Sequence, residues 1–205
     1  MTGLDWRAIE AAQRTRHPFD HVAIPQVLEP ACAAAIPREF PTIRAPGSFS
    51  LADARPGPAL AGLIDDLLSD RFRAQMSRIF DMDLEGRPAS VTLRGQCSAR
   101  DGRVYIDSRS KVLSLLIYLN EDWRGSDGQL RLLDSEASLE RPVVEIPAHL
   151  GSMVAFRRSE ASWHGHTPFI GQRRALQFNY LQTARASVVG QLRHRVSAFA
   201  KQLVA

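Results

Sequence analysis

Three residues in the second half of the chain have the types and the spacing of a metal site: Asp107, His164 and Arg173. A facial triad of two histidines and one carboxylate holds Fe(II) on one side and leaves the other coordination positions open. In its sequence form, the first histidine stands two residues before the carboxylate, and a basic residue follows the distant histidine by about nine positions. Arg173 follows His164 by nine positions, but Tyr105 stands in the place of the first histidine. The pattern predicts an iron site that lacks one usual ligand.

Each of these residues also has a plainer interpretation. Asp107 could be a turn or capping residue, since it comes just before a polar turn. His164 and His166 point to the same side if their segment is extended, but they could also be surface imidazoles of a hairpin. A guanidinium binds a carboxylate through two parallel hydrogen bonds, which suits Arg173 or Arg174. Only one of these two neighbours can point inward from a strand, and the count from His164 favours Arg173.

The elements that must position these residues are helical in the first part of the chain. Residues 41–58 are rich in Pro, Gly and Ala and predict an irregular loop. Four other stretches show helical periodicity or helix-start signals, and one stretch alternates between apolar and polar residues as a strand does. Helices are expected over residues 4–16, 29–36, 59–68 and 70–80, with a short strand over residues 19–27.

From residue 90 onward the pattern changes to short apolar or alternating stretches separated by turn signals. Strands are expected over residues 91–93, 103–106, 112–119, 129–133, 143–146, 153–156 and 175–181. Many short strands at such spacing are typical of a barrel or jelly roll. A last amphipathic helix, residues 184–205, is expected to pack on the outside of the sheet or at a homodimer contact. One domain is therefore predicted over residues 1–205, with residues 1–88 leading into a β core over residues 89–183.

Composition narrows the class of protein. The 205 residues are 44% hydrophobic and 23% charged, which is ordinary for a soluble globular domain. No apolar run approaches the ~20 residues that span a bilayer, and the polar N-terminus is not a secretory signal. Two cysteines, Cys32 and Cys97, give no disulfide framework, so a reducing cytoplasm is expected. The net charge of +4 comes from scattered arginines and does not predict a nucleic-acid partner.

Residues 87–183 resemble the superfamily of oxygenases that depend on 2-oxoglutarate (2OG) and Fe(II), in its prolyl 4-hydroxylase-like branch. The strand-helix lead-in over residues 19–41 also resembles that of small bacterial members. The stretches that carry the resemblance occur in the order expected of the family. They are Asp107 to Asn120, Asp122-Trp123, Asp127 to Leu132, Gly151 to Phe156, and Ser162 to His166 with Arg173.

The resemblance implies an α+β fold whose mainly β core is a double-stranded β-helix, or jelly roll, with flanking helices. It implies that Asp107 and His164 bind Fe(II), with Tyr105 in the third position. It also implies that Arg173 and Tyr118 bind the distal carboxylate of 2OG, although Tyr118 could equally be a core aromatic residue. The implied reaction uses Fe(II), O₂ and 2OG, releases succinate, and hydroxylates an aliphatic C–H of a small-molecule or peptidyl substrate.

Tyr105 leaves three outcomes open. Tyr105 could supply a phenolate to iron, although an ordinary phenol has a pKa near 10. Alternatively, water or another side chain could complete the coordination beside Asp107 and His164. In the third outcome the site has no oxygenase activity, and the jelly roll remains as a ligand-binding or interaction module.

Overall fold

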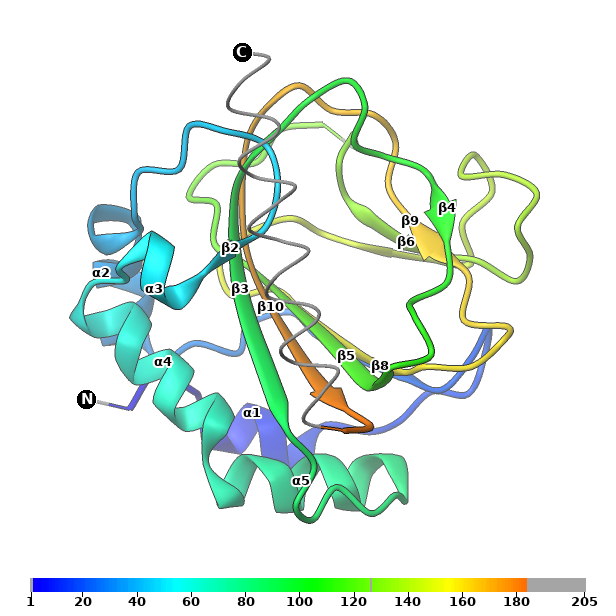
Figure 1. Ribbon diagram of the computed structural model, residues 1–205, viewed down its shortest axis with the longest axis horizontal. Coiled ribbons are helices and arrows are strands. Elements are labelled where there is room, and N and C mark those ends of the chain that lie inside the picture. Colours follow the sequence, from blue (N-terminus) through cyan, green and yellow to red (C-terminus); the bar gives the residue numbers. More distant parts are fainter. Residues whose placement is uncertain (1, 126, 184–205) are drawn as a thin grey trace.

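The computed structural model of the protein describes residues 2–125 and 127–183, whose strands form two sheets (Figure 1). The major sheet has, in spatial order, β1 (His21–Ile24), β8 (Met153–Arg157), β5 (Lys111–Tyr118), β10 (Gly171–Leu181), β3 (Ala89–Cys97) and β2 (Phe49–Ser50). The minor sheet has, in the same sense, β4 (Val104–Tyr105), β9 (His164–Gly165), β6 (Leu130–Leu132) and β7 (Val144–Ile146). The paired strands run antiparallel, as in a jelly roll.

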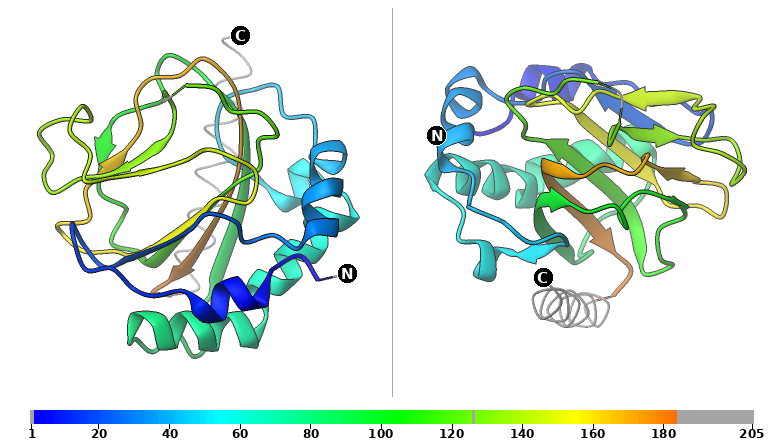
Figure 2. Two further views of the ribbon diagram at one scale, coloured as in Figure 1. Left: turned by 180° about the vertical axis from the view of Figure 1, so that it is seen from behind. Right: turned by 90° about the horizontal axis from the view of Figure 1, so that it is seen from above.

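Helices from the first part of the chain gather on one side of the major sheet, while the minor sheet lies on the other side (Figure 2). They are α1 (Trp6–Ala11), α2 (Pro30–Glu39), α3 (Leu51–Ala54), α4 (Pro58–Leu68) and α5 (Asp70–Phe80). Side-chain caps begin three of them: Asp5 accepts from backbone N–H groups of α1, and the Ser50 and Ser69 hydroxyls accept from an N–H of α3 and of α5, respectively. Proline at the first turn begins α2 and α4.

The alternation of side chains along the major strands separates two apolar cores. On the outer face of β10, Leu176, Phe178 and Tyr180 pack with the buried side chains of the helices. On the inner face, Ala175 joins a second core with buried side chains of the minor sheet. The same strand therefore stabilises the helical layer with one face and lines the barrel interior with the other.

The strands expected from residue 90 onward and the two helices near residues 59–68 and 70–80 are present with shifted bounds, but β9 was not expected and two other predictions were wrong. The helix expected over residues 4–16 ends at Ala11, because Thr15 and His21 exchange backbone hydrogen bonds of 2.8 Å and hold the chain extended there. The loop expected over residues 41–58 contains β2 and α3, whose first turn is capped by the Ser50 hydroxyl. The helix predicted for residues 184–205 lies outside the described residues.

Within residues 2–125 and 127–183, no helix has both the length and the apolar character that a bilayer span requires.

Candidate active site

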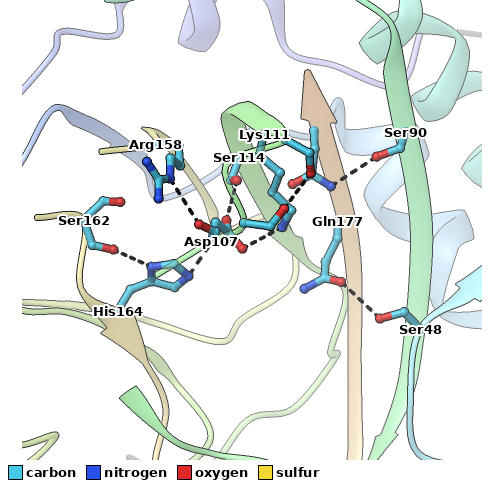
Figure 3. Close-up of polar contacts among 12 residues, drawn as sticks. Ser48, Ser90, Asp107, Lys111, Ser114, Arg158, Ser162, His164 and Gln177 are labelled. Carbon is cyan, nitrogen blue, oxygen red and sulfur yellow. Dashed lines mark hydrogen bonds and ion pairs between the residues drawn. The ribbon is translucent and has the colours of Figure 1, made fainter. Parts of the chain in front are cut away.

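Asp107 and His164 face each other inside the barrel, at the edge of the minor sheet (Figure 3). Asp107 follows β4, and His164 begins β9, which pairs with β4 so that Tyr105 lies opposite His164. Both side chains are buried, and His164 Nε2 lies 4.0 Å from Asp107 Oδ2. His164 Nδ1 lies 2.8 Å from the Ser162 carbonyl oxygen, which can only accept, so Nδ1 carries the proton and Nε2 keeps its lone pair. This is the tautomer that a metal-binding histidine needs.

The Asp107 carboxylate has two further partners. Lys111 Nζ donates to Oδ1 at 2.7 Å, and the Ser114 hydroxyl donates to Oδ2 at 2.5 Å. Arg158 Nε donates to the backbone oxygen of Asp107 at 3.1 Å and fixes the turn that carries it. Burial by itself would raise the pKa of Asp107, but Lys111, with smaller contributions from His164 and Ser114, brings the net pKa below the ordinary value. The carboxylate is therefore ionised at neutral pH.

Tyr105 lies beside this pair with its ring against the imidazole of His164. The two ring centroids are 4.4 Å apart at an interplanar angle of 61°. Burial, followed by the nearby charge of Asp107, raises the pKa of Tyr105 to about 12. The side chain is thus a neutral phenol at physiological pH and not a ready-made phenolate ligand.

Arg173 lies deeper in the barrel on β10, with only 2% of the residue exposed. Its Nε donates to the Gly128 carbonyl oxygen at 2.6 Å, and its Nη2 donates to the Tyr118 hydroxyl at 2.8 Å. The Tyr118 hydroxyl also accepts from the Leu130 N–H at 2.8 Å, so a β5 side chain links β10 to β6. Arg174 points to the other side of the sheet, where Nη1 donates to the Pro37 carbonyl oxygen. The structure therefore buries Arg173, and not Arg174, in the barrel.

His166 lies on the Arg173 side of the barrel. It is 6% exposed, and its Nδ1 lies 2.8 Å from the Thr167 carbonyl oxygen. Burial, followed by the positive charge of Arg173, lowers the pKa of His166 to about 4. His166 is accordingly neutral at physiological pH. Its hydrogen-bond partner, Thr167, is not shared with Asp107 or His164.

A small cavity of about 30 Å³ adjoins Asp107 and His164. Side chains from both sheets line it: Tyr105, Asp107, Lys111, Ser114, Leu115, Leu116, Leu130, Phe156, His164, Gln177 and Asn179. The volume is that of one water molecule in the liquid, so it accommodates an ion or a water but not 2OG without side-chain movement. A larger groove of about 410 Å³ between α2 and α4 contains none of the predicted site residues.

Sequence reasoning did not anticipate three of the side chains that contact Asp107: Lys111, Ser114 and Arg158. Ser114 carried a usable signal, because it is four residues before Tyr118 on one strand and therefore shares its inward face. Lys111 and Arg158 carried no comparable signal, since they reach Asp107 from the irregular ends of β5 and β8.

Residues 100–181 match the sequence model of the 2OG-Fe(II) oxygenase superfamily. The matched segment is 82 of the 205 residues and contains Asp107, His164 and Arg173. The match confirms the predicted class, that of 2OG-dependent dioxygenases, whose members use Fe(II), 2OG and O₂. No curated protein matches the chain by sequence.

Solved structures support the fold of this chain. A prolyl hydroxylase from Trichoplax adhaerens, solved with a peptide fragment of hypoxia inducible factor, has 17% identity and a TM-score of 0.55, with 82% of this chain and 86% of that chain covered. A prolyl 4-hydroxylase from Phytophthora capsici has 18% identity and a TM-score of 0.54, with coverage of 86% and 68%. A Pseudomonas putida prolyl-4-hydroxylase has 21% identity and a TM-score of 0.47, and the match spans 62% of this chain and 64% of that enzyme. The first two confirm the predicted jelly roll.

The donor set fits an iron ion in two positions and not in the third. Asp107 and His164 would hold the ion through Oδ2 and Nε2, which lie 4.0 Å apart and would have to approach each other to become neighbouring ligands at metal–donor distances of about 2.0–2.2 Å. Tyr105, whose phenol is protonated, stands at the sequence position of the third ligand. Among the residues that the structure describes, no group of three or more His, Cys, Asp or Glu side chains could hold a metal ion. The superfamily's metal therefore has a partial site here.

Proposed function

We propose that this chain is an atypical non-haem iron, 2OG-dependent oxygenase that hydroxylates an aliphatic C–H of a small-molecule or peptidyl substrate. One observation carries the proposal: a buried carboxylate and a correctly protonated imidazole face each other in the same barrel that buries Arg173. A structural ion pair does not need His164 to present an unprotonated Nε2 toward a carboxylate, whereas a metal site does.

In this proposal Asp107 and His164 hold iron, and Tyr105 occupies the third position without an ionised oxygen. When bound, iron and 2OG supply the oxidising chemistry that protein side chains lack. The carbonyl of Ser162 keeps His164 in the tautomer that can bind metal, and Ser114 orients the Asp107 carboxylate. The chain thus contributes ligand geometry and a water-poor interior.

Arg173 and Tyr118 are proposed to hold the distal carboxylate of 2OG. A buried guanidinium stays charged and offers paired N–H donors to a carboxylate, which the hydroxyl of Tyr118 can supplement. Both groups are already held in place by Gly128 and Leu130. The cosubstrate would meet donors whose orientation is fixed before binding.

The substrate class and the cellular compartment have only indirect support. The Trichoplax adhaerens prolyl hydroxylase was solved with a peptide, which is consistent with a peptidyl substrate for a chain of the same fold. The free thiols of Cys32 and Cys97 are both buried, which is consistent with a reducing cytoplasm.

A second function has its own supporting observation. Lys111 already neutralises Asp107, so the buried carboxylate is satisfied without a metal. This favours, as the alternative, a catalytically inactive jelly roll that binds a ligand in the barrel.

The two functions are distinguished by adding Fe(II) and 2OG to the protein without oxygen, and then admitting O₂. The oxygenase predicts a weak visible charge-transfer band before O₂ and succinate after it, with both lost in His164→Ala. A wild-type protein that gives neither signal, in a series where Tyr105→His restores both, would establish the inactive binding protein instead.

A further inference from the structure

Lys111 occupies the position from which a cation can neutralise the predicted metal ligand. Its Nζ lies 2.7 Å from Asp107 Oδ1, the side chain of Asp107 is 9% exposed, and that of Lys111 is 26% exposed. Figure 3 shows the lysine reaching Asp107 from the β5 side while His164 approaches from the opposite side. Lys111 also lines the small cavity beside Asp107 and His164.

Both oxygens of the Asp107 carboxylate are engaged in this arrangement. Oδ1 accepts from Lys111, and Oδ2 accepts from Ser114 while facing His164 Nε2. A divalent ion at Asp107 would therefore stand close to an ammonium group, and like charges at that distance repel strongly in a buried site. Metal binding requires the ammonium to move away.

We propose that Lys111 is the resident counter-ion of Asp107 and competes directly with the metal for this carboxylate. The proposal rests on the assignment of Asp107 as a metal ligand in the proposed function. Lysine suits such exchange because its charge sits on a flexible four-carbon stem, and the partial exposure of Lys111 gives the ammonium a path to solvent. The site thus has two arrangements, one paired with lysine and one bound to metal, and neither leaves a buried carboxylate without a cation.

Competition predicts that removal of the ammonium strengthens metal binding. Co(II) is a suitable probe because it takes nitrogen and oxygen ligands and its binding can be followed by calorimetry and by visible absorption. We expect Lys111→Met to bind Co(II) at least about 10-fold more tightly than the wild-type protein, a change of about 1.4 kcal/mol. Metal-free Lys111→Met should also melt at a lower temperature, because its buried carboxylate loses a partner, and added Co(II) should raise its melting temperature by more than that of the wild type.

Arg109 provides the matched control. It lies two residues from Lys111 in the sequence and loses the same charge in Arg109→Met, but its 84% exposed side chain pairs with Glu160 and not with Asp107. Arg109→Met should bind Co(II) like the wild type. If Lys111→Met fails to fold, Lys111→Gln removes the charge while keeping a hydrogen-bond donor, and it should show the same gain.

Equal or weaker Co(II) binding by the folded Lys111 variant overturns the proposal, as does an equal gain in Arg109→Met. This outcome is separable from failure of the proposed function. A wild-type protein that forms no succinate, in a series where Lys111→Met binds Co(II) more tightly, refutes the oxygenase activity and leaves the competition intact. Succinate formation together with unchanged Co(II) affinity refutes the competition alone.

Discussion

The barrel interior has two polar ends that are built in different ways. Around Arg173, two groups of the protein accept hydrogen bonds from the guanidinium: the Gly128 carbonyl oxygen and the Tyr118 hydroxyl. Around Asp107, by contrast, the partly exposed ammonium of Lys111 balances the charge, and His164 Nε2 stands 4.0 Å away. The first end keeps the features that the sequence pattern predicts, while the second departs from them at Tyr105.

Because of this difference, the two ends require different amounts of rearrangement before they can bind a ligand. The guanidinium at the Arg173 end is already oriented by its hydrogen bonds, so a carboxylate that entered there would meet a fixed donor, while entry of 2OG requires side-chain movement. The Asp107 end must exchange one cation for another before a metal is held there. Tyr105 at one end of the barrel thus coexists with a buried Arg173–Tyr118 pair at the other.

The largest expected effect is at the Arg173 end. Arg173→Ala should weaken 2OG binding by about 4 kcal/mol, or roughly 1,000-fold, because it removes a buried charged partner of the carboxylate. Anaerobic calorimetry with 2OG measures the change. Arg174→Ala is the matched control, since that side chain contacts Pro37 and Phe40 on the opposite face of the sheet and should leave the affinity unchanged. Equal affinities of the Arg173 variant and the wild type would remove the basis for calling this end a carboxylate site.

The next effect should appear at the Asp107 end. Tyr105→His replaces a neutral phenol by an imidazole beside His164 and completes a facial set of ligands. We expect Co(II) affinity to rise by about 100-fold, or about 3 kcal/mol, which is the upper range found for groups that support a metal site. Tyr105→Phe serves as control, because it keeps the ring and adds no ligand. A gain of the same size in Tyr105→Phe would mean that the phenol obstructs the site and that no third ligand is missing.

A third effect, of similar size, is a pH dependence of stability that arises at the Arg173 end. The pKa of His166 is depressed to about 4 in the folded protein, whereas an unfolded histidine titrates near 6.5. Below pH 6.5 the unfolded chain therefore binds a proton that the folded protein does not. The contribution of His166 is complete above pH 6.5 and is lost as the pH falls toward 4, by about 3 kcal/mol in total.

Urea unfolding at pH 7, 5.5 and 4.5 measures this loss of stability. His166→Gln should show a shallower decline than the wild type, whereas the same substitution at the exposed His149 should decline in parallel with it. Parallel curves for the wild type and His166→Gln would show that His166 is not held neutral by its surroundings.

The fold was predictable from sequence because its strands alternate and its turns are marked by glycine and polar residues. Alternation also assigns Ser114 and Tyr118 to the same face of β5, and the spacing from His164 correctly favours the burial of Arg173 over that of Arg174. These features depend on local geometry that repeats every two residues. The site roles of Asp107, His164, Tyr105, Arg173 and Tyr118 remain predictions.

The features that the sequence did not predict lie where the regular geometry of a strand or helix is interrupted. The register of β5 and β10 shifts between Tyr180 and Leu181, at the point where Leu181 pairs with Lys111. The ion pair of Lys111 with Asp107 therefore follows from a strand irregularity, and alternation alone does not predict it. The short helix at Leu51–Ala54 was missed for a similar reason, since one capped turn gives no measurable periodicity.

The unequal lengths of the strands have a kinetic consequence for the two ends. Arg173 and Tyr118 lie on strands of 11 and 8 residues within the six-stranded sheet, whereas Tyr105 and His164 lie on strands of two residues each. Short strands with few pairing partners open locally at a small fraction of the free energy of global unfolding. Backbone amides around His164 should exchange with solvent deuterium well before those around Tyr118. The half of the barrel that would hold a metal is thus the half expected to open locally more often. A bound ion should slow the exchange of the backbone amide hydrogens there.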